Sequence, residues 1–322
     1  MTAPAPRVTI MIPTYGQAPF LPRAIESALA QDYPALDVVV ADDASPDDTG
    51  TVVARYLGDA RLRYVRNPRN LGRVGNYRST LEHHARGIFV LNMDGDDWLV
   101  DHRYLSRAME LVERDPSLDL VFARAQSFLE ERQAFAEAGT VNRGLPEICD
   151  GTELFLAYPD GSVSIPHITA LYRRALALEL DFYREDVLGS DSIALLSLLP
   201  GRRVGFVDMH AGAWRKHDAN ATFAPSLAAQ LANLAVADVP AARAGARGAL
   251  PLPVLRRWRR RMAMRVGRKS VQDSLGLGRP GTAAAYLGVL AVTRPAVAAG
   301  IVSALARKVA RRTRGRARTA TP

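Results

Sequence analysis

The sequence Leu91-Asn92-Met93-Asp94-Gly95-Asp96-Asp97-Trp98 joins the end of an apolar segment to a cluster of acids. The apolar segment, Ile88–Leu91, predicts a buried β-strand that ends just before the acids. Acids crowded at a strand end repel one another, so a cation is expected there. Mg²⁺ or Mn²⁺ beside phosphate oxygens needs only one or two protein carboxylates. A solvated acidic turn is the alternative that this stretch alone leaves open.

On both sides of this segment, the spacing of hydrophobic residues alternates between that of β-strands and that of α-helices. Short apolar runs predict strands at Val8–Ile12, Val38–Val40, Leu62–Val65, Ile88–Leu91 and Leu118–Phe122. Apolar residues three and four positions apart predict helices between the strands, as at Leu21–Leu29 and Val74–Ala85. Ser45 followed by Pro46 predicts a further helix start. Alternating strands and helices with short connections predict an α/β fold with a mostly parallel, doubly wound sheet.

Polar residues follow three of these strands where each one ends. They are Pro13–Gly16, Ala41–Ser45 and the acids of Asp94–Asp97. Ligands of such sheets bind beyond the carboxyl ends of the strands, so the three clusters are predicted to form one site. For Asp42 and Asp43, capping of the next helix is the alternative.

The second half of the chain is less regular. Helices are predicted near Thr152–Ala157, Arg173–Leu180 and Ser192–Leu199, with a late strand at Val204–Val207. After Phe223 the sequence becomes rich in Ala and Leu and predicts helices. Two domains are therefore expected, at residues 1–225 and 226–322.

The charge of the chain is unevenly distributed. The net charge is +9 over 322 residues, yet Pro251–Pro322 contains 17 Lys and Arg against one acid, and the preceding residues are net acidic. The single cysteine, Cys149, excludes an intramolecular disulfide framework and a cysteine-based metal cluster. No signal peptide is recognisable, which predicts a cytoplasmic protein.

The basic C-terminal extension has two interpretations. Arg256–Arg261 is densely cationic, and the apolar segment Gly281–Ala306 is interrupted by Arg294-Pro295, so neither half is long enough to span a bilayer. Basic amphipathic helices would suit peripheral attachment to an anionic membrane at its inner face. A helical extension with a solvated, basic end is the alternative. No nucleic-acid-binding motif is present.

The polar clusters belong to a set of short segments whose order along the chain is informative. The matching segments are Val8–Tyr15, Val39–Ser45, Asn70–Asn76, Asp94–Asp97, Gly189–Asp191 and Arg215–Thr222. Together they span about two-thirds of the chain, and they resemble the motifs of family 2 glycosyltransferases of the GT-A fold. The resemblance implies a nucleoside-diphosphate sugar as donor and a divalent metal, Mn²⁺ or Mg²⁺.

The resemblance also implies roles for individual residues. The residues implied at the nucleotide-sugar site are Pro13, Tyr15, Asp42, Asp43, Arg73, Asp94, Asp96 and Arg215. Tyr15 would flank the base and Asp43 would hold the base or ribose. Asp96, Asp97 and His217 would hold the metal.

The catalytic base implied by the resemblance is Asp191. Ser190 precedes it where the family often has a second acid, and Asp186 is the alternative base. The implied reaction is inverting transfer to a hydroxyl of a glycan or lipid-linked acceptor. Separately from the resemblance, Ser162–Thr169, including His167, is expected to contact the acceptor, although no motif names it. One alternative is a nucleotidyltransferase, but that class usually begins with a Gly-rich phosphate loop, and Pro13–Gly16 is not such a loop. The other alternative is a non-catalytic membrane- or nucleic-acid-associated module on a degenerate transferase fold.

Overall fold

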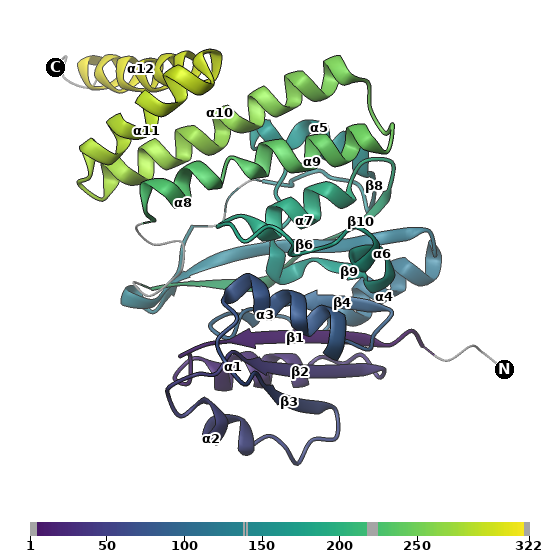
Figure 1. Cartoon of the computed structure of the whole chain (residues 1–322). Helices are drawn as coiled ribbons and strands as arrows, with labels where there is room; N and C mark the ends of the chain where they lie inside the picture. Colours follow the sequence, from purple (N-terminus) through teal and green to yellow (C-terminus); the bar gives the residue numbers. More distant parts are fainter. Residues whose placement is uncertain (1–4, 138, 140, 218–224, 319–322) are drawn as a thin grey trace. The chain divides into compact units, whose positions relative to one another are not determined.

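The computed structural model describes residues 5–137, 139, 141–217 and 225–318, with side chains up to Arg307. The chain divides into two compact units (Figure 1). The first comprises Met1–Asp186 with Ser190–Asn220, and the second comprises Val187–Gly189 with Ala221–Pro322. The expected functional boundary between residues 225 and 226 stays a prediction.

One mixed sheet forms the centre of the first unit. Its strands within the described residues are β1 (Val8–Thr14), β2 (Leu36–Asp42), β3 (Leu62–Arg66), β4 (Phe89–Asn92), β5 (Trp98–Leu99), β6 (Leu118–Leu129), β7 (Ala134–Phe135), β8 (Ile148–Asp150), β9 (Leu171–Arg173) and β10 (Arg203–Lys216). The strand order is β3-β2-β1-β4-β9-β6-β10-β5, with β7 paired to β6 and β8 paired to β10.

The predicted parallel arrangement is present on both sides of one antiparallel strand. β3, β2, β1 and β4 are parallel to one another, and β6 is parallel to β10. Between these groups lies β9, antiparallel to both β4 and β6. The short run Leu171–Arg173 lacks the length that would distinguish a strand from the start of the helix predicted at Arg173.

Helices cover the sheet of the first unit. They are α1 (Leu21–Leu29), α2 (Thr49–Ala54), α3 (Arg73–Ser79) continued by the π-helix η1 (Thr80–His84), α4 (Tyr104–Arg114), α5 (Gly151–Ala157), α6 (Arg174–Glu179) and α7 (Ser190–Leu198), with 3₁₀ turns η2 (Glu130–Arg132), η3 (Tyr158–Asp160) and η4 (His167–Thr169). Val8, Ile10 and Ile12 of β1 join α1 and α4 in one apolar core. The alternate residues of β1 point to the opposite face, where α3 packs. Full burial of each such aliphatic side chain contributes about 1.5–3 kcal/mol.

Helix α2 begins later than the sequence predicts. The predicted N-cap Ser45 lies four residues before Thr49, where α2 begins. The backbone N–H of Ser45 donates to Asp42 Oδ1 at 2.8 Å, and Ser45 Oγ accepts from the N–H of Gly16 at 3.1 Å. The N-cap prediction is wrong because Ser45 joins the loops after β1 and β2, while Asp47 Oδ1 accepts the N–H of Thr49 at 3.2 Å.

The second unit is helical, as predicted for the C-terminal extension. Its helices are α8 (Leu227–Ala232), α9 (Ala235–Ala246), α10 (Leu252–Gly276), α11 (Pro280–Thr293) and α12 (Pro295–Arg318). The predicted interruption at Arg294-Pro295 separates α11 from α12. Within the described part of the chain, none of the helices has the length and apolar character needed to cross a membrane.

A glycine before β4 allows β1 and β4 to approach closely. A Cβ atom at Gly87 would lie 2.5 Å from both the carbonyl oxygen of Phe89 and the backbone nitrogen of Thr9. We expect Gly87→Ala to lower the free energy of unfolding by about 2–3 kcal/mol, because backbone atoms cannot move aside. Urea denaturation measures the change. Gly58→Ala is the control, since a Cβ there meets nothing within 4 Å, and equal effects of both variants would contradict the packing argument.

Candidate active site

The acidic loop between β4 and β5 is fixed to the end of β1. The N–H of Met93 donates to the carbonyl of Met11 at 2.9 Å, and the N–H of Gly95 donates to the carbonyl of Pro13 at 3.1 Å. A Cβ atom at Gly95 would lie 2.7 Å from Thr14 Oγ1. Glycine therefore lets the loop lie against β1, and the acids on either side of it project from one turn.

Three carboxylates gather on this loop. One oxygen from each of Asp94, Asp96 and Asp97 lies within 4.8 Å of the others. Burial, together with the charge of Asp96, raises the pKa of Asp94 to about 7, against the opposing effects of Tyr77 and Arg73. Burial and the charges of Asp96 and Asp94 raise the pKa of Asp97 well above its usual range. The cluster holds more negative charge than its surroundings neutralise, which favours a cation.

Each acid of the loop has a different protein partner. The hydroxyl of Tyr77 donates to Asp94 Oδ1 at 2.5 Å. The imidazole Nε2 of His217 lies 2.9 Å from Asp96 Oδ2. The backbone N–H of Arg215 donates to Asp97 Oδ1 at 2.9 Å. The long strand β10 thus brings the predicted residues Arg215 and His217 to the acidic loop.

The guanidinium of Arg215 makes its contacts with other residues of the protein. It is buried, its Nε donates to the backbone carbonyl of Asp96 at 2.8 Å, and it forms an ion pair with Glu130. It also lies 4.7 Å from the ring centre of Trp98 and 4.8 Å from that of Phe20. These contacts hold the acidic loop, and the contact between Arg215 and a diphosphate stays a prediction. Residues 218–222 of the predicted late motif lie outside the described residues.

Trp98 is a core residue in this arrangement. Its side chain is 3% exposed and packs edge-on against Phe128 at 5.1 Å between ring centres. The guanidinium of Arg23 lies 3.6 Å from its ring centre. The indole therefore supports the loop from beneath rather than offering a surface for a sugar.

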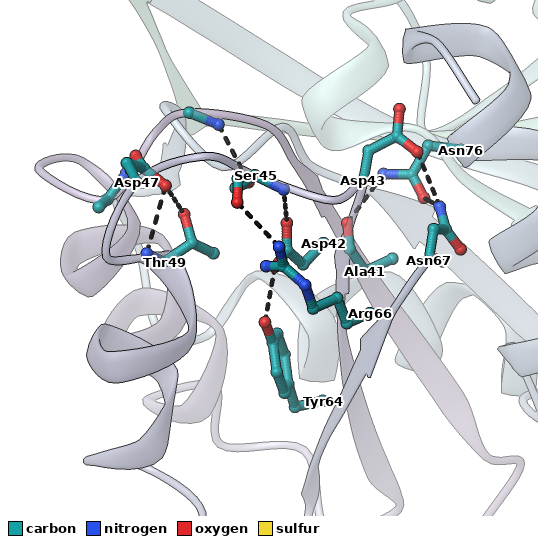
Figure 2. A network of polar contacts seen from close by, with 12 residues as sticks. Ala41, Asp42, Asp43, Ser45, Asp47, Thr49, Tyr64, Arg66, Asn67 and Asn76 are labelled. Carbon is teal, nitrogen blue, oxygen red and sulfur yellow. Dashed lines mark hydrogen bonds and ion pairs between the residues drawn. The ribbon is translucent and has the colours of Figure 1, made fainter. Parts of the chain in front are cut away.

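The two acids after β2 have different environments (Figure 2). Asp42 is fully buried and accepts from the hydroxyl of Tyr64 at 2.6 Å, from Arg66 Nη1 at 2.5 Å and from the backbone of Ser45. Although burial opposes ionisation, these hydrogen bonds and the charge of Arg66 lower the pKa of Asp42. Asp42 therefore holds the loop, and its predicted contact with a nucleotide stays a prediction.

Asp43 keeps one oxygen directed away from its protein partners. Its Oδ1 accepts from Asn67 Nδ2 and from the N–H of Leu71, both at 2.8 Å. Figure 2 shows the other oxygen pointing away from Asn67 and Asn76. Asn76 Nδ2 donates to the carbonyl of Ala41 at 2.8 Å and fixes the end of β2. At the end of β1, Tyr15 is 51% exposed.

The predicted base Asp191 lies within electrostatic range of the acidic loop. It stands in the first turn of α7, and its charge contributes to the raised pKa of Asp94. Burial lowers the pKa of Arg73, but Tyr77, Asp94 and Asp191 outweigh this effect and raise it. Three predicted residues, Arg73, Asp94 and Asp191, are thus brought together. The alternative base, Asp186, lies on the exposed surface.

His167, predicted to contact the acceptor, also lies near Asp191. Burial and the charge of Arg73 lower the pKa of His167 to about 4, while Asp191 acts in the opposite direction. The imidazole Nε2 lies 2.8 Å from the hydroxyl of Tyr183. His167 is therefore uncharged at neutral pH and serves as a hydrogen-bonding group beside the acids.

Tyr77, Asn92 and Tyr183 are site residues that the sequence patterns do not single out. Tyr77 has the spacing of a helix core position, and its contact with Asp94 comes from packing of α3. Asn92 Nδ2 lies 3.4 Å from His167 Nε2, and its Oδ1 is buried without a hydrogen-bond partner among the described residues. A polar residue at the end of an apolar strand is the one sequence signal that Asn92 carries.

A sheet of this topology with acids at the carboxyl ends of β2 and β4 is the arrangement of a GT-A type transferase. Residues 9–180 match the model of the family described as glycosyl transferase family 2. The chain belongs to this family. The prediction made from the ordered motifs is therefore confirmed.

Curated relatives match only part of the chain. The succinoglycan biosynthesis protein ExoO of Rhizobium meliloti is 41% identical over 92 residues, which are 29% of this chain and 26% of ExoO. The GalNAc(5)-diNAcBac-PP-undecaprenol beta-1,3-glucosyltransferase of Campylobacter jejuni is 36% identical over 97 residues, 30% of this chain and 31% of that enzyme. The matched stretch thus spans about a third or less of these relatives.

Solved structures match over more of the chain. Staphylococcus aureus TarS in complex with UDP-GlcNAc superimposes with a TM-score of 0.67 and 19% identity, covering 90% of this chain and 81% of that one. The mannosyltransferase PcManGT of Pyrobaculum calidifontis, in complex with GDP-Man and Mn²⁺, superimposes with a TM-score of 0.57 and 22% identity. The match covers 95% of this chain and 80% of that one. These similarities confirm the predicted GT-A fold.

The contacts of Asp42 predict a role in stability. We expect Asp42→Asn to lower the free energy of unfolding by about 1–3 kcal/mol, because the buried side chain loses its ion pair with Arg66 and must accommodate new N–H donors. Asp43→Asn is the matched neighbour and should cost less, since an amide oxygen still accepts from Asn67 and Leu71. Urea denaturation compares the two variants, and a larger loss for Asp43→Asn would contradict this assignment.

The raised pKa of Asp94 predicts a pH dependence of stability. The folded-state pKa of Asp94 is about 7 and lies above the unfolded value near 4. The stability that its protonation contributes is therefore fully present below about pH 4 and is lost as the pH rises through about 7. Between about pH 5 and 8, without divalent ions, we expect Asp94→Asn to gain on the order of 2 kcal/mol relative to the native chain. Urea unfolding in EDTA measures this gain, and parallel pH profiles would contradict it.

Proposed function

We propose that this chain is an inverting glycosyltransferase that moves a sugar from a nucleoside-diphosphate sugar to a hydroxyl group of an acceptor. The observation that carries the proposal is the convergence of Asp94, Asp96, Asp97 and Asp191 at one edge of a family 2 sheet. This arrangement supplies separate acids for the leaving diphosphate and for the incoming hydroxyl.

The donor nucleotide would lie along the ends of β1 and β2. The exposed ring of Tyr15 offers a face for the base, and the Asp43 oxygen that points away from Asn67 and Asn76 would accept from a base N–H or a ribose hydroxyl. The guanidinium of Arg73 stands beside Asp94 and suits phosphate oxygens. Pro13 shapes this edge through its carbonyl, which holds Gly95.

The residues of the acidic loop fit a divalent metal ion. Oxygen ligands on adjacent carboxylates suit Mn²⁺ or Mg²⁺, and burial together with the neighbouring acids raises the pKa of Asp94 and Asp97, which a bound cation would counteract. Asp96, Asp97 and His217 would hold the ion, with Asp94 at the same edge. When bound, such an ion would supply positive charge to offset the charge that develops on the leaving diphosphate.

Asp191 would take the proton from the acceptor hydroxyl during its attack on the anomeric carbon. A hydroxyl is a poor nucleophile at neutral pH, and a positioned carboxylate accelerates such a transfer by about 10²–10⁴. The electron pair of the C1–O bond leaves with the nucleoside diphosphate as the new bond forms on the opposite face. One displacement with one base inverts the anomeric centre.

The acceptor would approach from the side of η4. Neutral His167, held by Tyr183, can hydrogen-bond a sugar hydroxyl next to Asp191. The Campylobacter relative's name describes an undecaprenol-linked glycan, and ExoO's name describes succinoglycan biosynthesis. These names support a glycan or lipid-linked acceptor. The predicted cytoplasmic location and peripheral attachment at the inner membrane face belong to the same proposal.

Replacement of Asp191 tests the reaction. Purified protein is mixed with Mn²⁺ and UDP-, GDP-, dTDP-, CDP- or ADP-sugars, and release of nucleoside diphosphate to water is measured, which requires no acceptor. We expect one donor to be hydrolysed, and Asp191→Asn to lower the rate by about 10²-fold or more while the thermal shift on donor binding remains.

Asp186→Asn is the matched control, because Asp186 is an exposed acid near Asp191 in the sequence and should leave the rate unchanged. Asp43→Asn should weaken donor binding in the same assay. Full turnover by Asp191→Asn with loss in Asp186→Asn would move the base to Asp186. Absence of a thermal shift with every donor would favour the non-catalytic alternative.

A further inference from the structure

A pocket in the second unit is lined by arginines. Its volume is ≈ 520 Å³, and its walls come from α9, α10 and the junction of α11 with α12. The lining residues are Asp238, Arg256, Arg259, Arg260, Ala263, Thr293, Arg294, Pro295, Ala296 and Val297. All of them belong to the second unit, and none is implied in sugar transfer.

The arginines on α10 occupy one face of the helix. Arg256, Arg259 and Arg260 are followed by Ala263, a spacing of three, four and seven residues that places the four side chains on one side. Ala263 is buried and small, so the wall is recessed between the longer side chains. Arginines that are merely solvated need not line a pocket, whereas these arginines line one together with the α11–α12 junction.

The carboxylate of Asp238 contacts two of the four arginines in the lining. Arg294 donates to Asp238 Oδ1 at 3.1 Å and to Oδ2 at 2.5 Å, and Arg259 lies 3.8 Å from the same group. The guanidinium groups of Arg256 and Arg260 have no hydrogen bond or ion pair within the described part of the chain. Four guanidinium groups against one carboxylate leave a net formal charge of +3 in the lining.

We propose that this pocket binds a phosphate group with at least two negative charges, of the phosphomonoester or diphosphate type. Guanidinium groups match phosphate oxygens in geometry and form charge-assisted hydrogen bonds with them. Arg256 and Arg260 supply the free donors, while Asp238 fixes Arg294 at the rim.

The surroundings of the pocket admit two sources for such a group. Helix α11 has no charged side chain, and its Val289 and Val292 are 37% and 85% exposed next to Thr293 in the lining. An apolar surface beside a phosphate pocket suits a phospholipid with a phosphomonoester headgroup. A soluble diphosphate is the other source, and the two are separated by experiment.

The test uses the full chain in EDTA, so that metal-dependent binding at the acidic loop is suppressed. Inorganic pyrophosphate is titrated by calorimetry, and co-sedimentation is measured with phosphatidylcholine vesicles with and without phosphatidic acid. We expect Arg256→Gln/Arg260→Gln to weaken pyrophosphate binding at least tenfold, since two charge-assisted contacts are lost.

Arg257→Gln/Arg268→Gln is the matched control. It removes the same charge from exposed positions of the same helix that do not line the pocket, and should change binding less than about threefold. Binding of pyrophosphate and of phosphatidic acid vesicles, both lost in the pocket variant, identifies a lipid headgroup. Pyrophosphate binding without vesicle binding identifies a soluble ligand.

Two results would overturn the proposal: the native chain binds neither probe, or both double variants lose binding equally, as a non-specific basic surface would. The donor-induced thermal shift is recorded for both variants and should match the native chain. This readout separates the pocket from the proposed transferase function, because a failure of one leaves the other measurable.

Discussion

The mutual repulsion of Asp94, Asp96 and Asp97 is the constraint around which the first unit is arranged. Their carboxylates lie within 4.8 Å of one another, and burial raises the pKa of Asp94 and Asp97. Such an arrangement is unfavourable in an isolated fold. It persists because the β1 backbone, Tyr77, His217 and Arg215 each hold a part of the loop.

The supporting residues come from distant parts of the sequence. Tyr77 reaches the loop from α3, and Arg215 reaches it from the end of β10, where its guanidinium is enclosed by Trp98 and Phe20. These contacts fix the orientation of the acids through the protein's own side chains and backbone. Preorganised charge is effective in catalysis since little reorganisation is needed when the reaction begins.

The two units separate the chain's charges as well as its folds. The acidic site lies in the first unit, whereas the second unit contains the arginine pocket between α9, α10 and the α11–α12 junction. A net charge of +9 averages over these opposite regions and describes neither. The two proposals place phosphate in each unit for a different reason: beside the carboxylates it would require an additional cation, whereas the guanidinium groups would contact it directly.

The sequence by itself determined the parallel strands β1 to β4, the acids at the carboxyl ends of β2 and β4, the family, and the basic helical extension. These features are local: hydrophobic period, motif order and charge are all readable along the chain. Only the tertiary structure decided that β9 separates β4 from β6 and that Ser45 joins two loops instead of capping α2. It also decided that both oxygens of Asp42 accept hydrogen bonds, while one oxygen of Asp43 points away from Asn67 and Asn76. Neighbouring acids of identical chemistry differ only in what packs against them, and that depends on segments far away in the sequence.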